Sequence, residues 1–565
     1  MNTETGVFST VVKTGDHIKE TVLDASRLDP TGRPLVPTPT NDKYDPLNWS
    51  ATHKSICIFI VVYSYFMLTY FTTAPIPSFA FLQEQLNINY SQVSWSFAIP
   101  CLGLAIGPLL AGALADTYGR RPILIVSTAI AVVATGCTAL KNIKFGGYMA
   151  ARFFQGLGAG PSANIGLVII NDISWEHERG LRVGMWTIAA NCGTVLGGVF
   201  GGLLADAGEW VAYHVTILFA VLLILQCLLL PETLYPRAAV ILAERSSLSQ
   251  DESSGSILEF GIPRTKQLSY FFPMGVPVVT VKQPTMASAI SMPQRKAINI
   301  RKVPGVAHPK PWTTIVEFVH LLKYPTIVVS IVCYCFFQYW WIVSIMTLVP
   351  DAYVNDSPRV QGLLLIGLLI GLLAAEIVCS GNLSDKLVVY LTKKNGGERV
   401  PEMRLWLGLP AAIVSSLGLV LWGLSVDKNW HWMAGQVAFF LYAIGLQTGN
   451  TVLSAYIVDN YPDYANEVIT FYSVIINLSA FINPWFIFYW VEYSGYTWTF
   501  AAQCIICAFG LIPVYLLLQK YGAKLRSSRP LYLKRIDGLE PLSSSQKGNG
   551  LENGTSNGLT VEEKV

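Results

Sequence analysis

Twelve apolar segments, each long enough to cross a lipid bilayer, constrain the fold of this chain more than any other feature. A membrane-spanning helix needs about 20 mostly apolar residues. The segments lie at about 56–79, 92–114, 123–140, 146–170, 184–205, 211–230, 326–349, 361–383, 405–425, 432–457, 468–490 and 497–518. A chain inside hydrocarbon must pair its own backbone groups, so this pattern predicts an all-α membrane protein with twelve transmembrane helices.

The segments divide six and six around a polar stretch, which predicts five parts. These are a polar N-terminal tail (1–54), a six-helix bundle (55–235), a central loop (236–323), a second six-helix bundle (324–518) and a C-terminal tail (519–565). The central loop is rich in Ser, Pro and basic residues, and we expect it to be largely disordered. A weak amphipathic piece at about 313–322 is expected to lie on the membrane surface.

Composition excludes several classes of protein. Charged residues make up 13% of the chain, about half of the usual 25% of a soluble domain. The net charge of +3 is too small to indicate a nucleic-acid partner. All ten cysteines fall in apolar segments, so we expect no disulfide framework and no metal site. The histidines lie at termini, loops and segment edges, which argues against a membrane enzyme, and we expect no cofactor.

Positive charges predict the orientation of the chain, because cytoplasmic loops carry an excess of Lys and Arg. With both termini in the cytoplasm, the outer loops hold only Lys141, Lys144, Arg359 and Lys428, and Arg152 lies within a segment. Every other Lys and Arg is then cytoplasmic. We therefore expect a multi-pass protein with both termini in the cytoplasm, most simply in the plasma membrane.

The loop after the second segment carries the most distinctive motif. Residues 112–122 read Gly-Ala-Leu-Ala-Asp-Thr-Tyr-Gly-Arg-Arg-Pro, and the eighth segment ends with the matching Gly381-Asn-Leu-Ser-Asp385. Equal spacing at equivalent positions of the two halves indicates an internal structural repeat. Transporter folds show such repeats, with the binding site between the halves.

The spacing Gly-x-Leu-x-Asp-x-x-Gly-Arg-Arg resembles the loop 2–3 signature of the major facilitator superfamily. Arg152-x-x-Gln155-Gly-x-Gly-Ala159 resembles the signature of its fourth span. The fifth segment resembles the fifth-span signature of exporters through Gly184, Gly193, Gly197, Gly198, Gly201 and Gly202, with Gly198 where that signature has Pro. Three short motifs resemble fungal members of the twelve-span drug:proton antiporter group, namely Asp45-Pro-Leu-Asn-Trp49, Pro231-Glu-Thr233 and Pro401-Glu-Met-Arg-Leu405.

This resemblance implies the fold of two six-helix bundles and a secondary active transporter rather than an enzyme. It implies proton-coupled efflux of small organic molecules, such as drugs, xenobiotics or secondary metabolites, by alternating access. The expected partners are a small-molecule substrate, protons and the lipid bilayer, and we expect a monomer. Gly198 leaves an uptake carrier of the same fold open as an alternative, and a nutrient sensor that no longer transports is another.

The resemblance also implies a conformational switch at the cytoplasmic face. The residues assigned to it are Gly112, Asp116, Gly119, Arg120, Arg121, Asp172 and Asp385. We expect Asp116 to face the positive N-terminus of the eleventh helix and Arg120 to pair with an acid such as Asp172. Such contacts would hold the outward-facing state. The alternative is that Arg120 and Arg121 only anchor the topology through lipid headgroups.

Two charged residues inside segments are candidates for proton coupling. Charges at membrane depth are costly and usually functional, and Arg152 and Glu376 are such residues. Arg152 could instead reach the outer interface with its long side chain. Glu376 could instead pair with a basic group near the cytoplasm.

The seventh segment carries an aromatic run, 336–341, nearer its middle than its ends. Aromatic rings with amides could line a cavity for flat apolar or cationic molecules. The predicted cavity residues are Phe337, Gln338, Trp340, Trp341, Gln447, Asn450 and Asn477. Hydrogen bonding between helices is the simpler account of the amides.

Overall fold

The computed structural model describes residues 42, 44–237, 240–241, 308–461, 464–528 and 531, with scattered residues between 9 and 40. These described residues all belong to one compact unit, Met1–Leu531. Most of the predicted central loop and C-terminal tail lies outside the described residues.

Twelve described helices are long and apolar enough to cross a membrane, which confirms the predicted number of spans. The first six are built from α1 (Ala51–Thr73) with α2 (Phe79–Leu86), α3 (Tyr90–Tyr118), α4 (Arg120–Thr138), α5 (Phe145–Ala159) with α6 (Ser162–Ile173), α7 (Glu176–Leu204) and α8 (Trp210–Leu229). Short 3-10 turns lie at Pro46–Asn48, Ile76–Ser78 and Ala205–Ala207.

The last six spans contain two π-helical segments. The seventh span consists of α12 (Pro325–Tyr334), a π-helical turn (Cys335–Tyr339) and α13 (Trp340–Ala352), and the eighth of α14 (Pro358–Leu363), α15 (Ile366–Ala374), a second π-helical segment (Ala375–Leu383) and α16 (Ser384–Lys394). The ninth consists of a 3-10 turn (Pro401–Arg404) and α17 (Leu405–Asp427), and the tenth is α18 (Trp432–Asn460). The eleventh consists of α19 (Ala465–Ile482) and a 3-10 turn (Asn483–Trp485), and the twelfth is α20 (Ile487–Ser528), which kinks at Gly495. Near the N-terminus, β1 (Ser9–Thr10) pairs with β4 (Thr21–Val22), and β2 (Lys13–Thr14) pairs with β3 (His17–Ile18).

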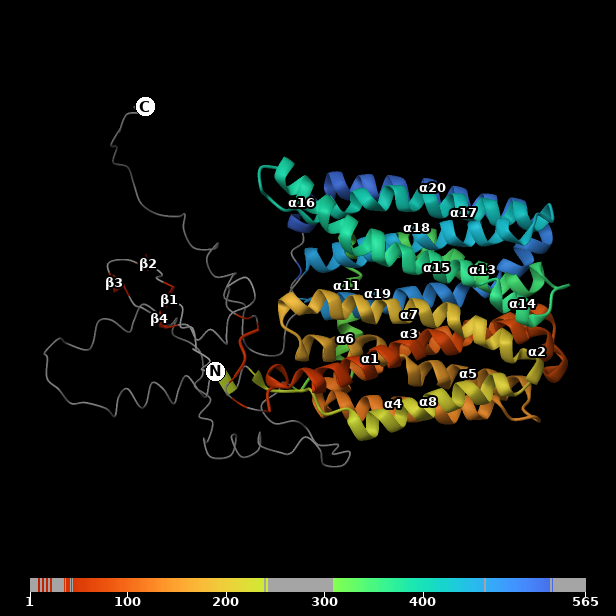
Figure 1. Cartoon of the computed structure of the whole chain (residues 1–565), viewed down its shortest axis with the longest axis horizontal. Coiled ribbons are helices and arrows are strands. Elements are labelled where there is room, and N and C mark those ends of the chain that lie inside the picture. Colours follow the sequence, from red (N-terminus) through yellow and green to blue (C-terminus); the bar gives the residue numbers. More distant parts are fainter. Residues whose placement is uncertain are drawn as a thin grey trace, which may run out of the picture. The chain divides into compact units, whose positions relative to one another are not determined.

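Local sequence explains where the first helices begin. The Ser50 hydroxyl accepts a hydrogen bond from the His53 N–H and caps α1. Asn89 and Gln92 form a capping box at the start of α3. The spans run side by side in Figure 1, and they form two groups that meet along α3, α7, α14, α15 and α19. We call the two ends of the bundles the Arg120 end and the Arg359 end, after a residue at each.

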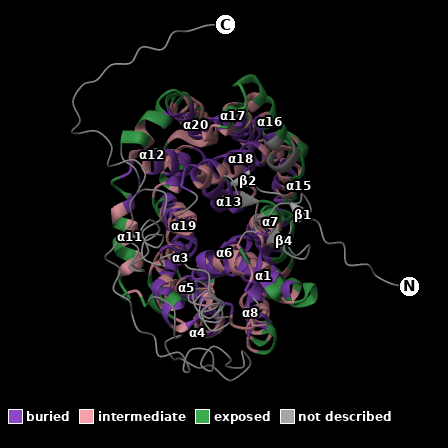
Figure 2. Cartoon of the chain, turned by 90° about the vertical axis from the view of Figure 1, so that its left-hand side faces the viewer, coloured by how far each residue is buried: buried purple, intermediate pink, exposed green. Residues whose placement is uncertain are grey.

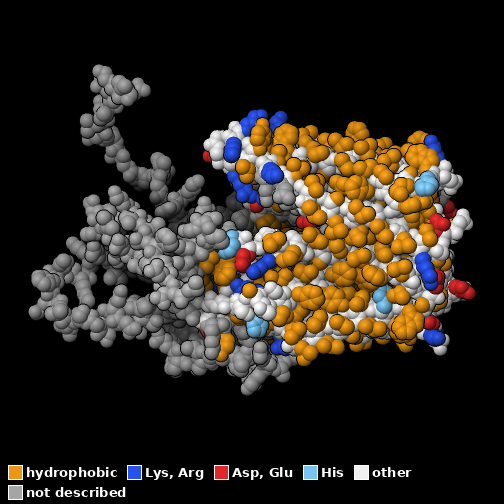
Figure 3. All heavy atoms as spheres, viewed as in Figure 1, with side chains coloured by type: hydrophobic (Ala, Val, Ile, Leu, Met, Phe, Trp, Pro, Cys, Tyr) orange, Lys and Arg blue, Asp and Glu red, His pale blue; other side chains and the backbone are white. Residues whose placement is uncertain are grey.

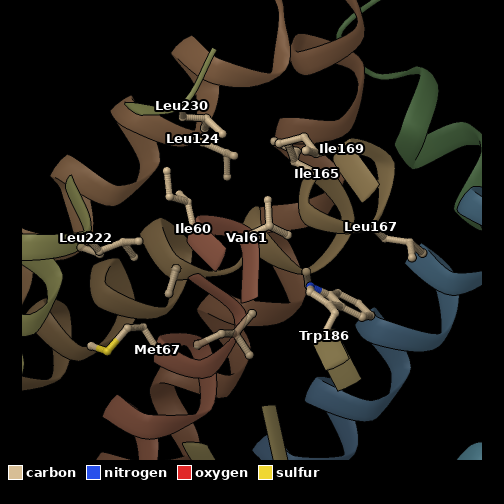
Figure 4. Close-up of a cluster of buried hydrophobic side chains, with 14 of the residues drawn as sticks. Ile60, Val61, Met67, Leu124, Ile165, Leu167, Ile169, Trp186, Leu222 and Leu230 are labelled. Carbon is tan, nitrogen blue, oxygen red and sulfur yellow. The ribbon is translucent and has the colours of Figure 1, made fainter. Parts of the chain in front are cut away.

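The core of the first bundle is a cluster of buried aliphatic and aromatic side chains from α1 and from each of α3 to α8, part of which Figure 4 shows. Trp186 of α7 stacks on Tyr65 of α1, with ring centroids 3.8 Å apart. Figure 3 shows the opposite pattern on the outside, where hydrophobic side chains cover the middle of the molecule and charged side chains gather at the two ends. An apolar band between charged ends is what a bilayer requires.

Helix α11 (Thr313–Leu321) forms where the amphipathic piece was predicted, but it lies against helices of both bundles. Figure 2 places it beside α3 and α19. The Phe318 and Phe471 rings pack 4.9 Å apart, and Thr314 lies where a side chain at Gly112 would stand. The surface placement expected from the sequence does not include this packing, because periodicity identifies an apolar face but not what covers it.

Candidate functional site

The loop between α3 and α4 is held by a carboxylate from the end of the sixth span. Glu232 accepts hydrogen bonds from the backbone N–H groups of Arg120 (2.9 Å) and Arg121 (3.1 Å) at the start of α4. An anion is stabilised there by unpaired N–H groups and the helix dipole. Gly119 has a φ of 102°, and a side chain on it would collide with the Glu232 carboxylate. The loop thus requires glycine at this position.

Arg120 lies within an acidic cluster at the same end. Its side chain is buried, its Nε lies 3.1 Å from Asp172 Oδ2, and its Nη2 lies 3.4 Å from Asp116 Oδ1. The predicted Arg120–Asp172 ion pair is therefore present, and it lies inside the first bundle. Arg121 donates from Nη2 to the Cys227 carbonyl, which ties the loop to the end of α8.

Asp116 faces the other bundle across a cavity of about 160 Å³. Asn466 and Glu467, at the N-terminus of α19, line the same cavity, as does Glu317 of α11. Asp116 is thus near the eleventh span, as predicted. Beside the cavity, Asn171 Nδ2 donates to Asn466 Oδ1 at 3.0 Å and joins α6 to α19. Asp385 lies in α16, and its side chain is outside the described part of the chain.

A buried ion pair holds the segment before α1 against the same cluster. Asp45 is fully buried and accepts hydrogen bonds from Arg237 Nη2 (2.9 Å) and from the N–H groups of Thr40 and Leu47 (3.0 Å each). Arg237 also donates to the Asp172 carbonyl. Burial raises the pKa of Asp45, but the hydrogen bonds from Arg237, Thr40 and Leu47 outweigh it, so this pKa lies below the ordinary aspartate value.

Arg152 is buried near the opposite end of the first bundle, where it binds backbone carbonyls. Its guanidinium donates to the carbonyls of Ser96 (3.0 Å), Phe71 (3.1 Å) and Thr72 (3.3 Å), and to Gln155 Oε1 (2.7 Å). Each of these acceptors is uncharged. Arg152 thereby joins α5 to α1 and α3 close to where α1 ends. Hydrogen bonds to these carbonyls explain how a buried guanidinium is accommodated without extending to the membrane–water interface.

Glu376 lies at the midpoint of the helical run from Pro358 to Lys394, at the start of the second π-helical segment. The candidate membrane span ends at Cys379, three residues after Glu376, but Glu376 contacts Gln447, which lies at the middle of α18. Gln447 Nε2 donates to Glu376 Oε2 at 2.6 Å. Asn191 Nδ2 of α7 donates to Gln447 Oε1 at 2.8 Å. The three side chains form a chain of hydrogen bonds from the second bundle to the first.

The glycines of α7 present two faces. Side chains at Gly193, Gly197 and Gly201 would collide with the carbonyls of Phe66, Tyr70 and Ala74 on α1. Gly198 and Gly202 instead allow close approach of the eighth span, through Leu365 and the Pro358–Gly362 turn. A side-chain carbon at Gly184 would meet no heavy atom of the described residues within 4 Å, apart from its own helix and chain neighbours. The motif thus packs one helix against partners in both bundles.

The predicted cavity residues have individual partners within the helices. Gln338 is fully buried and donates from Nε2 to Ser415 Oγ and the Gly445 carbonyl, at 3.0 Å each. Trp341 is buried and donates to the Phe337 carbonyl. Asn450 accepts from the Tyr472 hydroxyl, and Asn477 donates to a carbonyl of its own helix. Trp340 packs against Phe486, Phe336 and Trp341, and Phe337 packs against Gly510 of α20.

The bundles also meet at the Arg359 end. Arg359 Nε lies 2.6 Å from Asp206 Oδ2, which pairs the start of the eighth span with the end of the fifth. The Tyr90 hydroxyl donates to the Thr347 carbonyl at 2.9 Å. Trp95 and Trp485 stack with centroids 4.6 Å apart. These contacts join the two bundles at this end.

The family model of the Major Facilitator Superfamily matches residues 59–484, which is most of the chain. The chain belongs to the Major Facilitator Superfamily. The all-α fold of twelve membrane-spanning helices in two bundles, predicted from the sequence, is thereby confirmed.

Relatives in fungi carry transporter names. The chain is 24% identical to a "Probable efflux pump mfs2" of Aspergillus flavus, covering 80% of this chain and 98% of that protein. It is 25% identical to an "MFS-type efflux pump MFS2" of Trichophyton rubrum, covering 86% and 75%. A solved structure of the xylose transporter XylE from E. coli, in a partially occluded inward open conformation, matches with a TM-score of 0.54 at 14% identity, covering 83% and 98%. That structural likeness shows the fold.

In this superfamily member, three contributions escaped the sequence analysis. The Pro231-Glu232-Thr233 motif is recognisable in the sequence, but the sequence does not show that the Glu232 carboxylate accepts hydrogen bonds from the loop N–H groups. Asn191 is a polar amide within the apolar, glycine-rich fifth span, and this polarity is the sequence feature that could have indicated its role. The Asn171–Asn466 contact joins residues far apart in sequence, and no local pattern indicates such a pair.

Proposed function

We propose that this chain is a secondary active transporter that exports small organic molecules by proton-coupled alternating access. The observation that carries this proposal is the hydrogen-bonded chain of Glu376, Gln447 and Asn191. A carboxylate that contacts the middle of α18 and is linked to both bundles can take up or release a proton as the bundles rearrange. Buried acids in membrane proteins commonly serve such proton paths.

Export is the proposed direction, and two observations favour it. The glycines of α7 follow the fifth-span pattern of exporters, and the named relatives from A. flavus and T. rubrum are called efflux pumps. Drugs, xenobiotics or secondary metabolites are the proposed substrates. Uptake remains the second candidate, because position 198 is Gly where the exporter pattern has Pro.

The Arg120 cluster is the proposed conformational switch, with the Arg120 end in the cytoplasm and both termini on that side. Asp116, Arg120 and Asp172 lie beside the α19 N-terminus and the α11 helix. Movement of α19 away from Asp116 would break the contacts across that end. The charge distribution of the loops supports this orientation. A plasma-membrane location and a monomeric state belong to the same proposal.

Sealed inside-out vesicles with an imposed pH gradient test the proposal. An acidic lumen should drive accumulation of an exported compound, because protons leave as the compound enters. A panel of aromatic and cationic compounds would be screened by labelled uptake. Gradient-dependent loss of preloaded compound from the same vesicles would instead indicate an uptake carrier, and the absence of any gradient-driven flux would contradict transport of this class.

A further inference from the structure

We propose that Gln447 and Asn191 form an amide relay that makes the contact between α18 and α7 depend on whether Glu376 carries a proton. The inference rests on the proposed proton-coupled function. Its residues come from three helical elements and two bundles; Gln447 and Asn191 lie near the middles of α18 and α7, and Glu376 lies at the start of the π-helical segment. Gln447 is almost completely buried, and Glu376 and Asn191 are partly buried.

The carboxylate fixes the orientation of both amides. An ionised carboxylate only accepts hydrogen bonds, so the group of Gln447 that meets Glu376 must be its NH₂. The Gln447 oxygen then points away from Glu376 and can only accept. The group of Asn191 that meets it at 2.8 Å must therefore also be an NH₂. One charge at Glu376 thus sets the direction of every hydrogen bond in the relay.

Protonation removes this constraint. A proton from water forms an O–H bond on Glu376, and the charge of the side chain changes from −1 to zero without any transfer of electrons. The hydrogen bond from Gln447 is then a bond between neutral groups, which is roughly half as strong as one to a charged carboxylate. The new O–H can donate to the Gln447 oxygen. In that orientation Gln447 presents its NH₂ to the NH₂ of Asn191, and the contact between α18 and α7 must rearrange.

The neighbouring elements leave Glu376 as the group best placed to act. Helices α15, α16 and α18 pack against the π-helical segment that carries Glu376. The segment itself contains one other titratable residue, Cys379. The titratable residues of the three helices are Asp385, Lys386, Tyr390, Lys393, Lys394, Tyr442, Tyr456 and Asp459. Asp459 is paired with Arg399 and Arg404 at the Arg120 end. Lys386 follows Glu376 by ten residues along the chain and lies in α16.

Distance measurements on the full chain in lipid nanodiscs test the relay with protons as the only ligand. Spin labels would be attached to p-acetylphenylalanine at Leu203 and Val354, exposed residues of the two bundles at the Arg359 end. Pulsed electron–electron double resonance across a pH series measures the distance between the two spin labels. The expected result for the parent chain is a pH-dependent shift from a short to a longer distance as pH falls.

The variants separate the relay from the proton site. Glu376→Gln should lose the pH-dependent shift, whereas Asn191→Leu and Gln447→Met should each lose it with the carboxylate still in place. Thr194→Val is the matched control, since its hydroxyl donates within its own helix to Ala190, and it should keep the full shift. A shift retained in Glu376→Gln would overturn the proposed proton site. A shift lost in Glu376→Gln but retained in Asn191→Leu and Gln447→Met would overturn the relay alone.

Discussion

Two carboxylates, Glu232 and the buried Asp45, organise the Arg120 end of the protein. Glu232 accepts from four backbone N–H groups, those of Arg120, Arg121, Thr233 and Leu234. Asp45 does the same work for the segment before α1, with Arg237 as its charged partner. Both accept hydrogen bonds from N–H groups at a helix start and in the adjoining loop. Both also belong to short motifs that the family resemblance identified without giving a physical reason for them.

Replacement of Asp45 by Asn should destabilise the protein by about 2–3 kcal/mol, because Arg237 would keep its charge in a partly buried site without its partner. The pKa of Asp45 is lowered in the folded protein, so the stabilisation is complete above the unfolded pKa of about 3.9. It is lost as pH falls through the lower folded value. Thermal unfolding in detergent across pH measures this effect. An Asn variant with the parent's midpoint at neutral pH would contradict it.

At the scale of the element, α7 shows why a helix of the first bundle touches both halves. One row of glycines lets α1 approach, and Gly198 and Gly202 let the eighth span approach. Gly at position 198 fits this packing, because a side-chain carbon there, such as that of the Pro in the exporter pattern, would collide with the Leu365 side chain. The exporter-like pattern therefore has a packing function whatever the direction of transport.

Replacement of Gly201 by Val should cost about 1–3 kcal/mol, since the side chain would collide with the Ala74 carbonyl and force α1 and α7 apart. Gly184→Ala is the matched control, because no described residue outside its own helix approaches that position and alanine favours a helix. Thermal midpoints of the two variants in the same detergent check the expectation. Equal midpoints for Gly201→Val and the parent would show that this close approach is not required.

The start of α4 offers a second test at this scale. Glu232→Ala removes the acceptor for the first N–H groups of the helix, and a lost cap costs about 0.5–2 kcal/mol. We expect faster hydrogen exchange confined to the Arg120–Arg121 turn and the segment after α8. Unchanged protection at that turn would show that water or another group replaces the carboxylate without loss.

For the whole molecule, the sequence predicted twelve spans in two bundles, and the family resemblance implied the pairing of Arg120 with an acid such as Asp172. Long apolar segments leave few folds in a bilayer, and a distinctive loop motif identifies which one. The ends of the helices were less predictable, because α3 and the eighth span continue through polar residues beyond their apolar stretches. The placement of Glu376 beside Gln447 and Asn191, and of α11 between α3 and α19, depends on tertiary contacts that no periodicity encodes.

The most direct test of the central claim separates coupling from binding in proteoliposomes made with the Glu376→Gln variant. Counterflow exchange of labelled substrate needs binding and alternating access but no net proton movement, whereas accumulation against a gradient needs the proton. Ser454→Ala is the control, as its hydroxyl donates to Thr451 within α18, and it should behave as the parent. We expect Glu376→Gln to retain counterflow and to lose accumulation driven by a pH gradient. Accumulation at the parent's level in that variant would contradict a proton-coupling role for Glu376.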